Sequence, residues 1–248
     1  MLSAAAIAGL SEVRPGDDLA GLIAEAASGD LGDADVMVIA HKVVSKAEGR
    51  IRKLSDVEPS AGARELAARL DKDERHVQVV LDESREVLRA ERGVLICVTH
   101  HGFVCANAGV DASNVPGEDE VVLLPVDPDA SARALRSRFR ELTETAPAVL
   151  ITDSFGRAWR HGQVEVALGC AGLQPLDDWR GRQDANRREL KATWIAVADQ
   201  LASAADLARR KNSREPVVVV RGAERLIIEE DGPGAAAVLR AAEEDLFR

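Results

Sequence analysis

Short apolar runs of strand length, separated by segments with helical spacing, limit the folds open to this chain. Residues 94–98, 148–151 and 217–220 are apolar throughout, and each run holds only four or five residues, which suits a buried strand better than a helix. Residues 128–145 instead repeat apolar side chains along one helical face. No regular strand–helix–strand period links these segments. We therefore predict an α+β fold, with mixed sheets and flanking helices, rather than a doubly wound sheet.

Periodicity, turn residues and helix caps predict the elements in chain order. Strands are expected at residues 35–40, 51–54, 94–99, 121–124, 148–152, 164–168 and 216–220, with a short strand that enters a loop within residues 4–13. Helices are expected from a cap at Asp17 or Asp18 through Ala27, and at residues 59–70, 73–88, 128–145, 189–207 and 235–246. The strand at 216–220 is too apolar to lie at the edge of a sheet.

The length of the chain bounds the number of domains, and its net charge excludes some classes of partner. A chain of 248 residues is long enough to bury ~70% of its unfolded surface, and we treat residues 1–248 as one domain. The formal net charge of −10 argues against duplex DNA or an anionic membrane as the main partner. A local basic pocket for a phosphorylated ligand remains compatible with it.

Cysteine usage and the absence of targeting signals indicate a compartment. Cys97, Cys105 and Cys170 have no close pairing in sequence, which suits buried, reduced thiols. The N-terminus lacks the basic segment of a signal peptide, and no run approaches the ~20 apolar residues of a membrane span. We therefore expect a cytoplasmic protein without a membrane partner.

Two acidic segments follow apolar runs and resemble the two sides of one site. Asp111 and Asn114 come after the run at 94–98, and Asp153 and Ser154 come directly after the run at 148–151. Mg²⁺ is usually held by one or two protein carboxylates together with substrate phosphates, so two aspartates at separate strand ends suit it. The alternative is structural: Asp and Asn form turns, and Asp-Ser caps a helix.

A third polar segment follows the strand at 35–40. Ser45, Lys46 and Arg50 lie in residues 43–50, where a hydroxyl and two cations suit the gripping of phosphates. The Gly-x-x-x-x-Gly-Lys-Ser order of a Walker A loop is missing. The alternative is an exposed hairpin with a surface salt bridge.

Histidines and arginines offer further candidates for substrate contact. His100, His101 and His161 lack the spacing of zinc ligands, which favours structural or substrate-contacting roles. Arginines also accompany tryptophans in a way that suits an acidic, planar ligand, or else simple surface packing: Arg157 and Arg160 beside Trp159, and Arg180 and Arg182 beside Trp179.

Taken together, three motifs resemble the coenzyme F420-0:L-glutamate ligase family. They are residues 43–50, residues 106–114, and residues 152–157 with Trp159 and Arg160, and they occur in the family's order. The resemblance extends from Gly9 to Gly222. In actinobacterial relatives this ligase unit is the N-terminal half of a bifunctional enzyme, so the chain is either such a half or a standalone ligase.

The resemblance implies a fold peculiar to the family, a homodimer and a defined reaction. GTP drives the addition of L-glutamate to coenzyme F420-0, first as an amide and then as γ-linked glutamates, with an acyl phosphate as the intermediate. Mg²⁺ or Mn²⁺ is required, and K⁺ stimulates. Carried over residue by residue, the metal ligands are Asp111, Asp153 and Ser154, and the GTP contacts are Leu10, Ser11, Glu12, Val13, Ser45, Lys46, Arg50 and Asn114. Contacts to the anionic substrates are assigned to His101, Arg157 and Arg160.

The chain departs from the family pattern before its last apolar strand. Where relatives often carry a Met-Gly-Gln-like loop, residues 208–213 read Ala-Arg-Arg-Lys-Asn-Ser, which supplies cations for phosphate but no neutral metal ligand. Two other functions fit the same residues. One is a ligase or phosphotransferase that acts on another small acid, and the other is a non-catalytic guanine-nucleotide-binding module.

Overall fold

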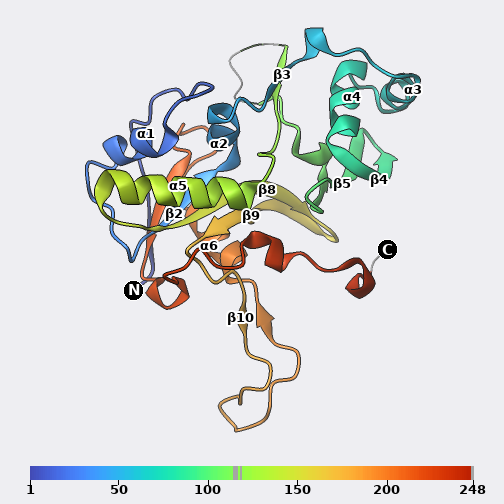
Figure 1. The fold of residues 1–248 in the computed structure, drawn as a ribbon. Helices are drawn as coiled ribbons and strands as arrows, with labels where there is room; N and C mark the ends of the chain where they lie inside the picture. Colours follow the sequence, from blue (N-terminus) through green and yellow to red (C-terminus); the bar gives the residue numbers. More distant parts are fainter. Residues whose placement is uncertain (114–116, 118, 247–248) are drawn as a thin grey trace.

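A mixed five-stranded sheet forms the centre of the molecule, as the computed structural model of the chain shows (Figure 1). The structure describes residues 1–113, 117 and 119–246. The strands lie in the order β1 (Ser3–Ala6), β12 (Val217–Arg221), β2 (Val36–Ala40), β8 (Ala148–Arg157) and β9 (Arg160–Ala171). Strands β2 and β8 pair in parallel, and all other neighbours are antiparallel. The predicted α+β class is confirmed, as is the interior position of the apolar strand β12.

Helices cover both faces of this sheet, which explains why its central strands are apolar without alternation. Met37 and Ile39 of β2 face a cluster that contains α1 (Leu19–Ala26) and α5 (Pro128–Thr143). Val36 and Val38 face the opposite cluster, which contains α6 (Val197–Asp206). All four of these side chains are fully buried. Gly169 of β9 has no room for a Cβ atom because the α5 backbone at Pro128 lies against it.

A smaller layer packs beside the central sheet. Strands β4 (Ser84–Glu91), β5 (Val94–Thr99) and β6 (Val104–Ala106) form an antiparallel sheet, which α3 (Ala61–Leu70) and α4 (Glu74–Asp82) cover with a hydrophobic cluster of their own. A two-stranded pairing of β3 (Ile51–Lys53) with β7 (Glu120–Val122) flanks the segment that forms this layer. Short 3-10 turns complete the path: η1 (Leu54–Asp56), η2 (Asn107–Gly109) and η3 (Glu224–Leu226).

The segment after the central strand β2 is a helix rather than the loop or exposed hairpin expected from its composition. Helix α2 (His41–Ala47) begins directly where β2 ends. Val43 and Val44 pack into the core beneath the sheet, and Ser45 and Lys46 are buried with them. The apolar pair therefore anchors the helix, and the polar residues are held at fixed positions.

Three predicted helices are shorter than expected. The helix predicted over 73–88 ends at Asp82, because residues 84–91 pair with β5 across a turn in which Arg92 and Gly93 both have positive φ, as two-residue hairpins require. The helix predicted over 189–207 begins only at Val197. The final helix predicted over 235–246 is two 3-10 turns, η4 (Ala235–Val238) and η5 (Ala242–Glu244).

The segment that precedes α6 forms an arm instead. Strands β10 (Asp177–Asp178) and β11 (Trp194–Ile195) pair at its base, and Figure 1 shows the chain between them extending away from the body. Arg180 stacks on Trp194 with its guanidinium carbon 3.8 Å from the ring centroid, and Arg182 lies 5.2 Å above Trp179. These two arginine–tryptophan contacts therefore stabilise the arm.

The packing of α5 generates a stability prediction. Phe139 is fully buried between α5 and the sheet, whereas Leu142 on the same helix is 42% exposed. Phe139→Ala should lower the free energy of unfolding by about 3–5 kcal/mol, because it removes buried apolar surface and leaves a cavity. Leu142→Ala is the control and should cost less than about 1 kcal/mol. Urea denaturation measures both, and equal losses would contradict this packing.

Candidate active site

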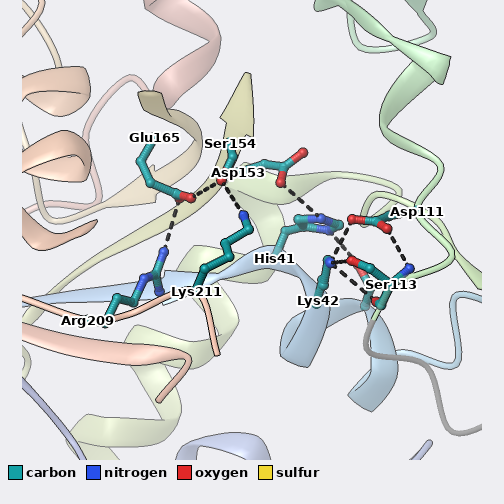
Figure 2. A network of polar contacts seen from close by, with 10 residues as sticks. His41, Lys42, Asp111, Ser113, Asp153, Ser154, Glu165, Arg209 and Lys211 are labelled. Carbon is teal, nitrogen blue, oxygen red and sulfur yellow. Dashed lines mark hydrogen bonds and ion pairs between the residues drawn. The ribbon is translucent and has the colours of Figure 1, made fainter. Parts of the chain in front are cut away.

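Two aspartates that are far apart in sequence converge on consecutive residues at the start of α2. Lys42 Nζ lies 2.6 Å from Asp111 Oδ2, and His41 Nε2 lies 3.5 Å from Asp153 Oδ1. Figure 2 shows both carboxylates directed at this junction of β2 and α2. The prediction that Asp111 and Asp153 form two sides of one site agrees with this geometry.

The strand pairing explains how Asp153 reaches the junction. The parallel β2–β8 register ends with Ala40 opposite Thr152, so the next residue on each strand is His41 and Asp153. Residues 153–157 were expected to form a turn or a helix cap, and this is wrong. They continue β8, because β9 pairs with it as far as Arg157.

Asp111 is placed by backbone pairing and by two side-chain contacts. Its N–H and carbonyl both bond to Val122 of β7, and its carboxylate accepts hydrogen bonds from the Ser113 amide at 2.6 Å and from Lys42. Burial alone would raise the pKa of Asp111, but the hydrogen bonds from Lys42 and Ser113 outweigh it and lower the pKa below its ordinary value. Asp111 is therefore a carboxylate at neutral pH. Asn114 lies outside the described residues.

His41 was not singled out from the sequence, and its ring faces Asp153 without a hydrogen bond to it. Its ring is 1% exposed, with Nδ1 3.4 Å from the Ser45 hydroxyl and Nε2 facing Asp153. Ser45 itself is fully buried, so its contact is with His41. The sequence contained a signal for His41 and Lys42: two polar residues directly follow a buried strand, and side chains at strand ends often form functional sites.

The cationic loop at residues 208–213 reaches Ser154, the residue after Asp153. Lys211 Nζ donates to the Ser154 hydroxyl at 2.9 Å, and Ser154 Oγ donates to Glu165 Oε1 at 2.6 Å. Arg209 pairs with Glu165 at 3.2 Å. Since Asp153 and Ser154 are neighbours, these groups and the pair at α2 form one polar network (Figure 2).

The other predicted nucleotide contacts lie around α2. Lys46 pairs with Glu12 at 2.6 Å, which ties residues 10–13 to this helix. Ser11 and Glu12 line an open hollow of about 570 Å³, while Val13 is buried in the core. Arg50 donates to the Leu124 carbonyl at 3.0 Å and pairs with Glu83 at 2.7 Å.

The predicted substrate contacts are not gathered at this network by any interaction of the described residues. His101 Nε2 lies 2.8 Å from the Pro125 carbonyl oxygen, and its ring stacks on Phe103. Arg157 donates to the carbonyls of His161 and Gly162 within the β8–β9 hairpin. Arg160 lies opposite Arg157 in that hairpin, and both are exposed.

Comparisons with known proteins decide the family. A family model described as F420-0:Gamma-glutamyl ligase matches residues 9–222. The chain belongs to this family. It is 47% identical to the coenzyme F420:L-glutamate ligase of Methanopyrus kandleri over 96% of this chain and 94% of that protein. Identity is 45% to the Haloarcula marismortui enzyme of the same name, with 98% and 94% coverage. It is 42% to the Methanothermobacter thermautotrophicus enzyme, with 100% and 99% coverage.

Family membership makes this chain an enzyme of the ligase class, and it raises the question of whether the site fits a divalent metal. The donors at the network are two carboxylates and a hydroxyl, which are the hard oxygen ligands that Mg²⁺ and Mn²⁺ take. Among the described residues no group of three or more His, Cys, Asp or Glu side chains could hold a metal. The protein would therefore supply only one or two carboxylates, and substrate oxygens or waters would supply the rest, as is usual for Mg²⁺.

The remaining expectations concern cysteines and membrane spans. Cys97, Cys105 and Cys170 are buried and free, as predicted, and burial raises the pKa of the Cys105 thiol to about 12. No helix within residues 1–113 or 119–246 is long and apolar enough to cross a bilayer.

The Lys42–Asp111 contact generates a prediction about pH. In the folded protein the pKa of Asp111 lies below its ordinary 3.8, so its ionised form stabilises the fold above that pH, and this contribution is lost as the pH falls. Lys42→Met should raise the pKa of Asp111, because burial is then opposed only by Ser113. The loss of stability should consequently begin at a higher pH.

Carbon-13 NMR titration of the Asp111 carboxyl measures this pKa. Lys191→Met, which removes an exposed lysine of the arm, is the control and should leave it unchanged. An unaltered Asp111 titration in Lys42→Met would show that Lys42 does not set the charge state of the site.

Proposed function

We propose that this chain is a GTP-dependent ligase that adds L-glutamate to coenzyme F420-0, first through an amide and then through γ-linked glutamates. Its relatives at 42–47% identity are named coenzyme F420:L-glutamate ligase and align over nearly the whole chain. The observation that carries the proposal is the convergence of Asp111 and Asp153 on Lys42 and His41.

The chemistry begins with a carboxylate that must be activated before an amine can displace one of its oxygens. Transfer of the γ-phosphoryl group of GTP to the acceptor carboxylate forms an acyl phosphate and releases GDP. The amine of glutamate then attacks the acyl carbon, inorganic phosphate leaves, and the amine loses a proton. Phosphoryl transfer of this kind depends on positioning and on compensation of the phosphate charge.

A bound Mg²⁺ or Mn²⁺ would neutralise charge on the phosphates. Asp111 and Asp153 would hold it, with the Ser154 hydroxyl as a third ligand. With Asp111 directed at the metal, the Lys42 ammonium, which also donates to the Ser113 hydroxyl at 2.7 Å, would be available to a phosphate oxygen. His41, which contacts Ser45, would stay beside Asp153.

The nucleotide would lie over the outer side of α2. The Glu12 salt bridge joins Lys46 to residues 10–13, and Ser11 and Glu12 border an open hollow, which supports a role of this segment in the GTP site. Arg50 and Asn114 complete the proposed contacts. His101, Arg157 and Arg160 stay predictions for the anionic substrates.

The proposal includes a stimulating K⁺, a homodimer and a cytoplasmic location. Three buried, free thiols support a reducing compartment.

The carboxylates provide the direct test. Asp153→Asn and Asp111→Asn should each lower GTP-dependent glutamate addition by roughly 100-fold or more, because a lost metal ligand removes several kcal/mol of charge stabilisation. The reaction of GTP, F420-0 and L-glutamate with Mn²⁺ is followed by mass spectrometry of the product. Asp178→Asn, in the exposed arm, is the control and should retain activity.

Thermal unfolding of each variant is the measurement that checks whether its fold is intact. Full activity in Asp153→Asn would remove that residue from the metal site. Binding of GTP by the unaltered protein without release of phosphate in the presence of both substrates would point to the non-catalytic module instead.

A further inference from the structure

Glu165 is a buried carboxylate that no step of the proposed reaction uses. It lies on β9 opposite Ser154 and is 4% exposed. An ionised carboxylate in such a position is costly unless it is paired and hydrogen-bonded. Oε1 of Glu165 accepts from Ser154 at 2.6 Å, and Oε2 lies 3.2 Å from Arg209 without a hydrogen bond. A buried carboxyl group with these two contacts requires an explanation beyond packing.

The direction of the hydrogen bonds around Ser154 supplies an explanation for the buried Glu165. A serine hydroxyl has a single hydrogen and two lone pairs, whereas an ionised carboxylate can only accept. The hydrogen of Ser154 is therefore committed to Glu165, and its lone pairs face the other side. Lys211 Nζ stands there at 2.9 Å, and an ammonium can only donate. Ser154 is thus oriented as an oxygen acceptor for a cation.

The Lys211 ammonium lies at the position next to these lone pairs where a metal cation would bind. The neighbouring residue on the same strand is Asp153, whose carboxylate faces His41 (Figure 2). Lys211 is exposed, so its ammonium is free to leave when another cation arrives.

Arg209 contacts Glu165 at the carboxyl oxygen that does not face Ser154. Its guanidinium is largely buried, donates to the Pro216 carbonyl at 3.0 Å and also pairs with Asp206 at 3.4 Å. Because it is fixed by these partners, it keeps Glu165 Oε2 in position and leaves Oε1 for Ser154.

We propose that Glu165 is a positioning residue that takes the hydrogen of the Ser154 hydroxyl and so presents the Ser154 lone pairs to a divalent cation. This inference rests on the proposed metal site at Asp111 and Asp153.

Glu165→Gln tests the orientation with little change of shape. Arg209 needs an acceptor, so the new amide oxygen turns to Arg209 and the amide NH₂ faces Ser154. The hydroxyl must then accept from the amide, so its hydrogen is no longer held away from the cation and only one lone pair remains for the metal. Mn²⁺ affinity should fall roughly 10–100-fold, the usual effect of removing a group that orients a metal ligand.

A double-mutant cycle separates this effect from the loss of a nearby negative charge. Mn²⁺ binding is measured by electron paramagnetic resonance for the unaltered chain, Glu165→Gln, Ser154→Ala and the double variant, together with Tm. We expect both single variants to bind more weakly and the double variant to bind no more weakly than Ser154→Ala. Asp206→Asn, which removes the other carboxylate partner of Arg209, is the control and should leave the affinity unchanged.

Two results would overturn the inference. One is an unchanged Mn²⁺ affinity in Glu165→Gln. The other is that Glu165→Gln lowers the Mn²⁺ affinity equally in the unaltered chain and in the Ser154→Ala variant. Failure of the unaltered chain to bind Mn²⁺ would overturn the metal site itself, and is recognised before any variant is compared.

If Glu165→Gln does not fold, the surface variant Lys211→Met tests the same inference. Lys211→Met should tighten Mn²⁺ binding by up to about fivefold, the range of an exposed charge contact, because it removes the group now placed at the lone pairs. The effect should vanish in Ser154→Ala. Arg210→Met makes the same charge change at the next residue and should have a smaller effect. Equal effects of Lys211→Met and Arg210→Met would contradict the proposed orientation.

Discussion

The parallel pairing of β2 with β8 is the constraint on which the site depends. Its register brings the last residue of β2 opposite Thr152, so that the chain on one side turns into α2 while the other continues with Asp153. Both strands are buried over the paired stretch except at Ala40, and helices cover each face, so a slip of register would move every core side chain. The packing of the core thus fixes the position of the Asp153 carboxylate.

A balance of charges follows from this geometry. Asp111, Asp153 and Glu165 each face a basic side chain, and these partners come from two separate segments, the start of α2 and the loop after α6. Buried or half-buried carboxylates need such partners, and the partners also reduce the repulsion between the carboxylates. In the proposed reaction, a metal and a nucleotide would carry opposite charges and would take over these pairings together.

The loop at residues 208–213 shows how the fold gives different contacts to neighbouring residues of one charge. As a sequence it is a run of cations without a neutral metal ligand. In the structure Arg209 is turned inward against a buried carboxylate, while Lys211 reaches outward to a hydroxyl beside the site. Two cations that lie only two residues apart therefore have different surroundings, which composition alone cannot distinguish.

The sequence by itself determined the fold class, most of the strands and the two aspartates, because apolar runs and polar residues after them are local patterns. It did not place the ends of the helices predicted over 73–88, 189–207 and 235–246, nor the continuation of β8 through Asp153, because pairing with distant strands decides them. Only the tertiary structure joined His41 to Asp153 and Glu165 to Ser154. Those contacts depend on the register between strands that local periodicity does not encode.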